Sequence, residues 1–592
     1  MTLILLTILL VIMDYHFRWK NEQWKYAVHT DAYFYNRYLP MIFINHKLDN
    51  QTENPMVIKY YVGTSLLYLP FFALAYAGSY FLGLPADGYS ILFPVFISIG
   101  TLFYLISGFC YFNKFLSYYN ISPWIKCFIF GVMTFGTTAF YYVVNAPGWA
   151  HICAFALICF LMYHLKKMVT DFHKTSIPAI IAGLSILFFT RPTDITILLI
   201  APFLALNFKN LQETFRRILV EKKTILTGML LAFIPLACQL GIYKAYTGHF
   251  FIWSYKNEGF NFTHPELMKV LFGYAKGFFV YTPICFLSLF GLIPLYKMNR
   301  RLFSGIIIYL SLTIYLISSW WCWNYGSTFG PRAFIEHYPV FFFLLALIIQ
   351  VNGRLLKITL ITFSMLLCAL NLFQVYQSLC GILDHDFKTN SKGYWNVFLS
   401  TQNGYSGKFY RFPVDETEGN IVGRKCWFND MEKTDSTWLN PTTKSPLNAH
   451  SGRFSSEVNK NNCYSIGLRK NLSELRYAKN VVIRVSGWFL VSKKGSGSFF
   501  VMCFKSKGDN LNYNTFNLDG YMLNTHKWEY QVFEMYMPKF TKTIENEHAV
   551  QAEFYYFNNS PIDCFVDDLK IEFIEFKKMD RVLDLNWNEG IL

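Results

Sequence analysis

The sequence predicts an α-helical polytopic membrane domain of about 11–13 helices followed by an all-β sandwich. Hydrophobic residues make up 53% of the 592 positions and charged residues only 15%, whereas a soluble chain carries about 25% charge. Long apolar runs occupy the first part of the chain, and short alternating stretches between turn residues occupy the rest. This composition excludes both an ordinary soluble enzyme and a disordered chain.

The net charge of +15 belongs to the apolar part of the chain. Residues 1–383 hold 27 Lys and Arg against 13 Asp and Glu, whereas residues 384–592 hold 26 against 25. Basic loops hold the cytoplasmic ends of membrane helices in place, so the excess is a topology signal. Because the near-neutral second part offers no basic face, we expect no nucleic-acid partner.

Apolar runs mark the candidate helices of the first part, although several are shorter than the roughly 20 residues that cross a bilayer. One pair is interrupted by Arg191, Pro192 and Asp194, a polar break that a membrane tolerates only against protein or a water-filled cavity. The runs lie at 2–13, 62–82, 91–113, 124–144, 149–164, 177–190, 193–208, 224–246, 277–296, 302–321, 333–351 and 358–380.

Short strands with turn signals between them are typical of an antiparallel β-sandwich. The clearest expected strands are 481–490, 498–504, 528–536, 551–557 and 569–576.

Four segments follow from these patterns. We expect a membrane domain over 1–383, a linker over 384–419, the sandwich over 420–578 and a C-terminal tail over 579–592. Thirteen cysteines are scattered without the C-x-x-C spacing of a zinc or redox site. The four cysteines after residue 383 could form disulfides if the sandwich is extracytoplasmic, and their pairing is left open.

Basic loops around 166–174, 209–223, 297–301 and 354–357 predict the cytoplasmic side. Alternation then puts the loops around 191–194, 247–276 and 322–332, with everything after about 381, on the outer side. The first loop, 14–61, is ambiguous. If all four apolar runs between 62 and 164 cross the membrane, this loop lies on the cytoplasmic side. A catalytic role for its acidic residue needs the loop on the outer side, which requires that one of the four runs is re-entrant or wrongly divided.

Polar residues at outer helix ends are the candidates for chemistry, because charge near a membrane core is costly and usually functional. Four clusters stand out: His29-Thr30-Asp31-Ala32-Tyr33-Phe34-Tyr35-Asn36-Arg37, Lys59-Tyr60-Tyr61-Val62-Gly63-Thr64, Asn145-Ala146-Pro147-Gly148-Trp149-Ala150-His151, and Trp320 to Arg332 followed by Glu336-His337. Arg191 is a candidate to join them.

This set resembles the GT-C superfamily of integral-membrane glycosyltransferases over residues 1 to about 380. The resemblance is carried by the acidic residue of the first outer loop, by K-Y-x-x-G-T-x-L-L-Y-L-P-F-F from Lys59, and by W-N-Y-G-S-T-F-G-P-R ending at Arg332. With P-A-D-G-Y-S at 85–90, these motifs are similar to those of Bacteroidetes membrane proteins in that superfamily.

The resemblance implies an inverting transfer of a sugar from a polyprenyl-phosphate donor to a glycan, lipid or protein acceptor. Asp31 would be the catalytic base, since the acceptor nucleophile needs a base within hydrogen-bond reach. Cations would hold the donor phosphate, and Arg recognises phosphate with two parallel bonds. The expected donor- and substrate-binding residues are Lys59, Arg191, Arg332, His151, Glu336, His337, Tyr35 and Trp323.

Each of these residues also has a structural interpretation. Asp31 could cap a helix over 32–45, and Lys59 and Arg332 could anchor helix ends at lipid headgroups. His151 could be a packed interface histidine, and Glu336 suits the positive end of a helix. No ligand spacing supports a metal, so the sequence leaves open a divalent cation at Asp14, His16, His29 or Asp31.

The second part has its own resemblance. Ala449-His450-Ser451-Gly452-Arg453-Phe454-Ser455, then Trp488 and Phe565-Val566-Asp567-Asp568-Leu569, are similar to a galactose-binding-like jelly roll of carbohydrate-binding modules. For Asp567 the resemblance favours a structural role in the final strand over a ligand contact.

We therefore expect a multi-pass glycosyltransferase of the bacterial inner membrane, part of the cell envelope, with its sandwich in the periplasm. The alternative is a non-catalytic membrane scaffold or transport component that presents the sandwich. A transporter would place its polar groups near the membrane midplane within broken helices, which only 190–194 suggests.

Overall fold

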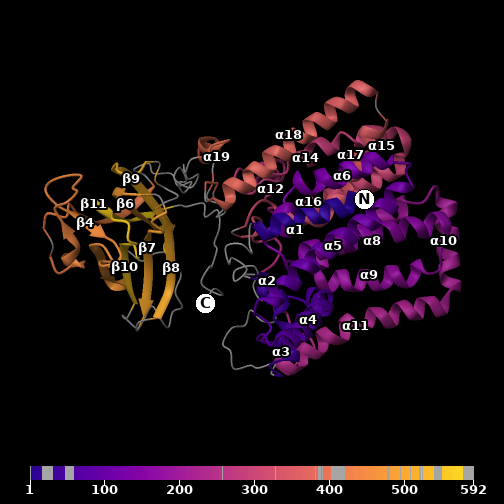
Figure 1. Ribbon diagram of the computed structural model, residues 1–592, viewed down its shortest axis with the longest axis horizontal. Helices are drawn as coiled ribbons and strands as arrows, with labels where there is room; N and C mark the ends of the chain where they lie inside the picture. Colours follow the sequence, from indigo (N-terminus) through magenta and orange to yellow (C-terminus); the bar gives the residue numbers. More distant parts are fainter. Residues whose placement is uncertain are drawn as a thin grey trace. The chain divides into compact units, whose positions relative to one another are not determined.

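The computed structural model divides into two compact units, Met1–Val375 and Tyr376–Leu592 (Figure 1). The described residues are 2–16, 28, 31–46, 59–255, 258–326, 328–351, 353–380, 382–383, 389, 391–401, 420–433, 435–475, 481–493, 495–506, 509–518, 522, 524–538 and 550–577. The expected tail, 579–592, and most of the expected linker lie outside these residues, as does His29.

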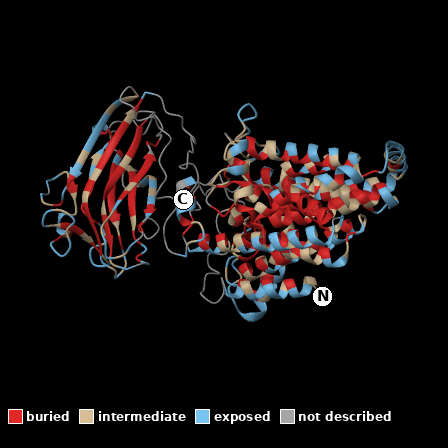
Figure 2. Ribbon diagram, turned by 90° about the horizontal axis from the view of Figure 1, so that it is seen from above, coloured by how far each residue is buried: buried red, intermediate tan, exposed pale blue. Residues whose placement is uncertain are grey.

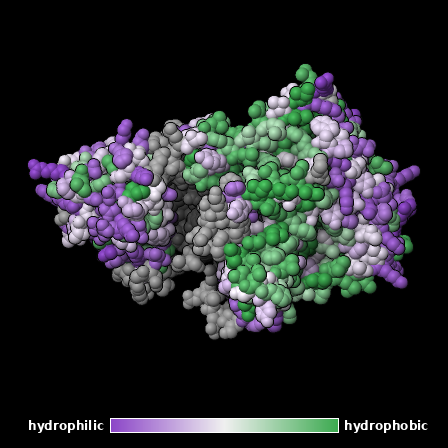
Figure 3. All heavy atoms as spheres, viewed as in Figure 1, coloured by the Kyte–Doolittle hydropathy of each residue, from purple (hydrophilic) through white to green (hydrophobic). Residues whose placement is uncertain are grey.

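The first unit is a helical membrane domain. Within the described residues, seven helical segments are long and apolar enough to cross a membrane. Figure 3 shows the matching hydrophobic band, which gives way to hydrophilic residues at the end where α10 lies. The seven are α4 (Gly63–Leu82), α5 (Leu92–Ser117), α8 (Ala150–Asp171), α11 (Lys222–Thr247), α16 (Arg300–Ser319), the segment Arg332–Val351, and α18 (Arg354–Leu379).

Shorter helices complete the unit and confirm the predicted class of fold. They are α1 (Thr2–Asp14), α2 (Asp31–Asn36), α3 (Tyr38–Phe43), α6 (Pro123–Phe135), α7 (Ala139–Val144), α9 (Ser176–Thr190), α10 (Phe208–Val220), α12 (Leu267–Phe272), α13 (Phe278–Tyr281), α14 (Pro283–Leu289), α15 (Leu292–Met298) and α17 (Tyr338–Val351), with 3-10 helices η4 (Pro192–Phe203) and η5 (Arg332–His337).

Three predicted runs are not single straight helices. The run 124–144 divides into α6 and α7, and 277–296 divides into α13, α14 and α15, with Pro283 as the first residue of α14. Proline has no N–H and cannot continue the preceding helix, which explains that break. The run 193–208 is the 3-10 helix η4, and the axes of η4 and α10 differ by 118°.

After the last residues of α18, the second unit contains the short α19 (Ser391–Val397) and two antiparallel sheets. One has the order β3-β4-β11-β6-β9, with β1 also on β11; the other has the order β2-β5-β10-β7-β8. Their strands are β1 (Ile421–Asn429), β2 (Trp438–Leu439), β3 (Lys444–Ser445), β4 (Ser455–Val458), β5 (Gly467–Asn471), β6 (Val481–Val491), β7 (Phe499–Ser506), β8 (Asp509–Asn517), β9 (Glu529–Tyr536), β10 (Val550–Phe557) and β11 (Cys564–Phe576).

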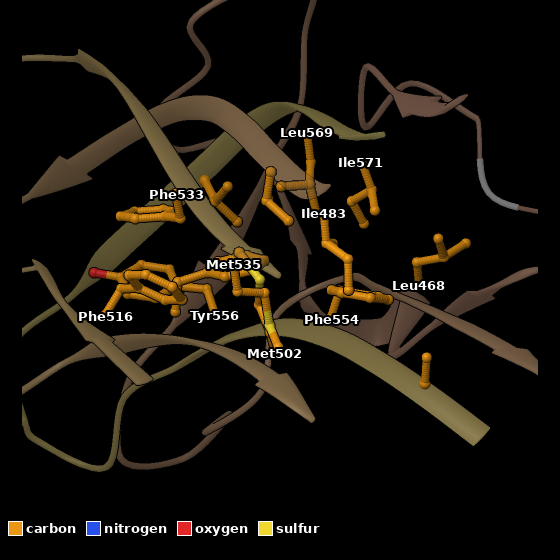
Figure 4. Close-up of a cluster of buried hydrophobic side chains, with 14 of the residues drawn as sticks. Leu468, Ile483, Met502, Phe516, Phe533, Met535, Phe554, Tyr556, Leu569 and Ile571 are labelled. Carbon is orange, nitrogen blue, oxygen red and sulfur yellow. The ribbon is translucent and has the colours of Figure 1, made fainter. Parts of the chain in front are cut away.

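Alternating side chains from both sheets form one core. Ile483 of β6, Met502 of β7 and Phe533 of β9 are among its buried members (Figure 4), and many residues of these strands are buried (Figure 2). Because inward and outward residues alternate along a strand, this core confirms the β-sandwich that the period-two pattern predicts. The thirteen cysteines all lie in the described part of the chain and none is in a disulfide, so the disulfides considered for the second part are not seen in this structure.

Candidate functional site

The first unit contains a cavity of about 490 Å³, which we call the main cavity. Its lining joins residues from α2, the segment before α4, the start of α8, the end of α9 and the loop before η5. Seven of the nine expected site residues line it: Asp31, Tyr35, Lys59, His151, Arg191, Arg332 and His337. Glu336 contacts two of these, as described below.

Asp31 is the first residue of α2, and both of its carboxylate oxygens are bonded to side chains. The Tyr60 hydroxyl donates to Oδ1 over 2.7 Å, and Arg332 Nη2 donates to Oδ2 over 2.8 Å. The side chain is 21% exposed, so one edge is open to the cavity. The helix that Asp31 was expected to cap, 32–45, is divided into α2 and α3, and Asp31 is itself the first residue of α2.

Glycine at position 63 allows Tyr60 to reach Asp31. Gly63 starts α4, and a Cβ there would collide with the backbone of Phe189 and Thr190 at the end of α9. Only glycine permits so close a backbone approach. This close packing of Gly63 holds the Lys59–Tyr60 segment beside the end of α9, which is followed directly by Arg191.

Arg332 is fixed on two further sides. Its guanidinium lies over the Trp149 ring at 4.4 Å from the centroid, a favourable cation–π arrangement. Gly330 has a φ of +63°, and a Cβ there would collide with the side chain of Thr138, so the turn before η5 also requires glycine. The G-P-R sequence therefore delivers Arg332 to Asp31 in a defined orientation.

A second network lies deeper, around Arg191. Its guanidinium Nε forms an ion pair with Glu336 Oε1 and lies 3.3 Å from Asp194 Oδ2. His151 Nδ1 lies 3.2 Å from Glu336 Oε2, and His337 Nε2 lies 3.8 Å from Asp194 Oδ1. Glu336 is fully buried and Asp194 nearly so, and buried carboxylates need such partners.

This network also contains the residues that could hold a metal. Ligand atoms of Asp194, Glu336 and His337 all lie within 4.8 Å of one another. Arg191, however, forms ion pairs with both carboxylates, so its cation supplies the charge that a metal would otherwise provide. A divalent ion at this place would require Arg191 to move away, and the residues as arranged fit the guanidinium better.

Lys59 is also paired. Its ammonium donates to Glu258 Oε1 over 2.5 Å, with the two side chains 17% and 25% exposed. All three expected phosphate-binding cations, Lys59, Arg191 and Arg332, are thus paired with carboxylates. A donor phosphate would therefore have to compete with these carboxylates, and the donor-binding role of the three cations stays a prediction.

Aromatic side chains form much of the remaining wall. They are Tyr61, Phe188, Trp253, Tyr255, Phe260, Trp320, Trp321 and Tyr325. Trp323, expected as a substrate contact, does not line the main cavity, and Lys269 Nζ lies 5.8 Å from its ring centroid. The nearby Tyr325 takes a lining position instead.

Three functional candidates were not singled out from the sequence. Tyr60 belonged to a noted motif, but nothing distinguished it from Tyr61. Asp194 stood in the noted polar break without an assigned role. Glu258 lies in a loop without any pattern that would select it.

Burial keeps the phenols beside Asp31 protonated. It raises the pKa of Tyr60 well above its usual value, and the charge of Asp31 raises it further. The pKa of Tyr35 is raised for the same two reasons. Tyr60 therefore donates its proton to Asp31 in a hydrogen bond and does not compete with it as a base.

In the second unit, Asp567 ties a loop to the final strand. Its Oδ2 accepts from the backbone N–H of His450 at 2.8 Å and of Ser451 at 3.1 Å. The His450 ring stacks on Trp488, with centroids 3.8 Å apart. This geometry agrees with a structural role for Asp567.

No family model and no curated protein sequence matches the chain. The arabinosyltransferase EmbB from Mycobacterium smegmatis is similar at 10% identity and a TM-score of 0.31, covering 82% of this chain and 58% of its own. A family 16 carbohydrate-binding module gives 14% identity and a TM-score of 0.16, covering 22% and 82%.

The CBM22-1 xylan-binding domain of Paenibacillus barcinonensis Xyn10C gives 15% identity and a TM-score of 0.18, covering 25% of this chain and 94% of its own. At scores this low, the function has to be argued from the residues of this chain. Those residues define a multi-pass membrane protein with an appended β-sandwich.

Proposed function

We propose that the chain is a membrane glycosyltransferase that moves a sugar from a polyprenyl-phosphate donor to an acceptor at the outer face of a bacterial inner membrane. The observation that carries the proposal is the convergence of a partly open carboxylate, Asp31, with Lys59, Arg191 and Arg332 on one aromatic-walled cavity. Aromatic faces suit a sugar ring or a lipid headgroup, and the cations suit a phosphate.

In the proposed reaction, Asp31 accepts the proton of the acceptor nucleophile as that atom forms a bond to the anomeric carbon. The bond from this carbon to the phosphate oxygen breaks on the opposite face, so the configuration inverts and the lipid phosphate leaves with its electron pair. Tyr60 and Arg332 hold Asp31 in place. Lys59 is the most exposed of the three cations, with 17% of its side chain exposed against 14% for Arg191 and 13% for Arg332.

Contacts between helix ends support an outer position for Asp31. Tyr118 after α5 bonds Asp171 at the end of α8, and Ser122 before α6 bonds Gln350 near the end of α17. At the opposite ends, Arg332 before α17 lies over Trp149 before α8. We therefore infer that α5, α6 with α7, and α8 make three crossings.

If these three crossings are made, α4 is the apolar run that begins and ends on the same side of the membrane. At its start, Ser65 Oγ donates to the backbone carbonyl of Tyr35, and soon after its end Tyr89 stacks on Tyr33. Both contacts are to the short helix α2. With three crossings after it, α2 lies opposite the basic loop 166–174, which reconciles the charge pattern with an outer position for Asp31.

Transfer assays on the purified full chain in detergent, with a panel of sugar-loaded undecaprenyl phosphates and envelope glycans or lipids as acceptors, test the proposal. Release of undecaprenyl phosphate coupled to acceptor glycosylation is the expected result. The transport alternative predicts movement of the intact donor between leaflets of proteoliposomes without cleavage, which would overturn the enzyme proposal.

A further inference from the structure

Helix α2 separates two cavities. Asp31 and Tyr35, four residues apart, line the main cavity, whereas Tyr33 and Arg37, also four residues apart, line a second one of about 200 Å³. Residues at this spacing share one helical face. We call the latter the rear cavity. Nothing in the proposed transfer reaction uses it.

The walls of the rear cavity come from four parts of the chain. Tyr68 and Phe72 of α4, Phe93 and Ile97 of α5, Pro40 of α3 and Gly88 of the connecting loop join α2 around it. Most of these side chains are apolar or aromatic. The exposed ring of Phe43 lies 6.4 Å from that of Phe72, and the helices that supply the walls carry further exposed apolar residues, among them Leu74 of α4 and Ile99 of α5. The rear cavity is therefore placed where a lipid can reach it.

Two polar groups face this apolar enclosure without the partners such groups usually have. Among the described residues, no carboxylate lies within ion-pair distance of Arg37, and its guanidinium contacts the Tyr33 ring at 5.5 Å. The Asn36 amide donates to the carbonyls of Ala32 and Gly148, but its buried Oδ1 has no hydrogen-bond partner in that part of the chain.

The contrast with the main cavity is informative. Lys59, Arg191 and Arg332 each face a carboxylate of the chain, as expected for charges taken out of water. Arg37 in the rear cavity has no such partner among the described residues, so its guanidinium is available to an anion that enters the cavity. A planar guanidinium binds phosphate oxygens with two bonds, and the Asn36 carbonyl oxygen can accept from a hydroxyl of a headgroup.

We propose that the rear cavity binds the phosphate head of an anionic amphiphile through Arg37, with the hydrocarbon part lying outside along α4 and α5. About 200 Å³ admits a headgroup but not its chains. Two sources share this chemistry: a phospholipid of the bilayer and a polyprenyl phosphate. The proposal does not depend on the transferase activity.

Native mass spectrometry of the full chain in neutral detergent tests it, with phosphatidylglycerol, undecaprenyl phosphate and uncharged diacylglycerol titrated separately. Arg37→Gln should weaken one phosphate-lipid site by about tenfold or more, since hydrogen bonds to charged groups contribute about 1.5–3 kcal/mol. Arg300→Gln is the matched control, because Arg300 also lies over a tyrosine ring, at 5.0 Å from Tyr296, but lines neither cavity.

A second variant keeps the charge of Arg37 but fills the rear cavity with a larger side chain. Ile97→Trp should also lower binding at this site, whereas simple attraction of anionic lipid to Arg37 would be unaffected. Whichever phosphate lipid saturates the Arg37-dependent site at lower concentration identifies the source. Equal binding by wild type and Arg37→Gln, or equal binding of diacylglycerol, would overturn the proposal.

Discussion

Arg332 Nη2 donates to Asp31 Oδ2 over 2.8 Å, joining residues 301 positions apart in the sequence. The guanidinium is held from behind by Trp149, and the other oxygen of Asp31 accepts from Tyr60. A carboxylate fixed by two donors has a defined direction, and a base is effective only when it is oriented toward the proton it accepts.

Tyr60→Phe removes one of these two donors and little else. We expect turnover to fall by about tenfold, the effect of losing a hydrogen bond of about 1–1.5 kcal/mol, while donor KM changes little. Steady-state kinetics with the donor varied would measure both. Tyr315→Phe is the control, because its hydroxyl donates to the Phe262 carbonyl and lies outside the main cavity. Equal losses in the two variants would contradict a specific role for Tyr60.

Arg332→Lys should mainly lower turnover, because Arg332 orients Asp31. Lysine keeps the charge but loses the planar face over Trp149 and the fixed donor fork. We expect a loss of about tenfold or more in turnover, and a smaller change in donor affinity. If donor affinity were lost instead, with turnover at saturation retained, Arg332 would be a phosphate ligand and the Asp31 contact would be secondary.

Glu258→Gln should tighten donor binding. The substitution removes the negative charge that holds Lys59, so the ammonium no longer has to leave a carboxylate before it meets the phosphate. A severalfold lower donor KM is expected, with Lys59→Gln giving the opposite change. Glu266→Gln, which breaks the exposed pair with Lys269, is the matched control. An unchanged KM in Glu258→Gln would show that Lys59 does not bind the donor.

The sequence predicts the class of each unit well, because both depend on local patterns. Five strands were expected from period-two alternation, and β6, β7, β9, β10 and β11 occupy those positions. Helix breaks at Gly136 and before Pro283 were missed, since a run of apolar residues does not reveal where a helix bends inside a membrane.

The site was predictable as a set of residues but not as a set of pairs. Polar residues at outer helix ends are conspicuous because burying them is costly, and Asp31, Lys59, Arg191 and Arg332 were found this way. Which carboxylate faces which cation depends on packing between segments hundreds of residues apart. Glu258 shows the limit most clearly, since a single glutamate in a loop carries no signal of the lysine it meets.

The sandwich should fold without the membrane domain, and its stability should depend on Glu553. Burial alone would raise the pKa of this carboxyl, but hydrogen bonds from Lys505 and Arg469 outweigh it and lower the pKa overall. The resulting stability is present above the unfolded pKa, about 4.3, and is lost as pH falls through the lower folded value.

Urea unfolding of the excised segment 420–578 from about pH 6 to 3 would measure this effect. We expect the wild-type free energy of unfolding to fall toward acid and Glu553→Gln to show a smaller fall. An excised segment without β structure by circular dichroism would place the boundary elsewhere, and identical slopes would remove Glu553 from the explanation.

Turnover of Asp31→Asn tests the central claim most directly. Asparagine preserves the size of the side chain and can still accept from Tyr60, but it cannot take a proton from the acceptor. Turnover should fall by about 10²–10⁴-fold, as for the loss of a general base, with donor affinity within about threefold of wild type. Wild-type turnover in Asp31→Asn would contradict the assignment of Asp31 as the base and, with it, the proposed chemistry of the main cavity.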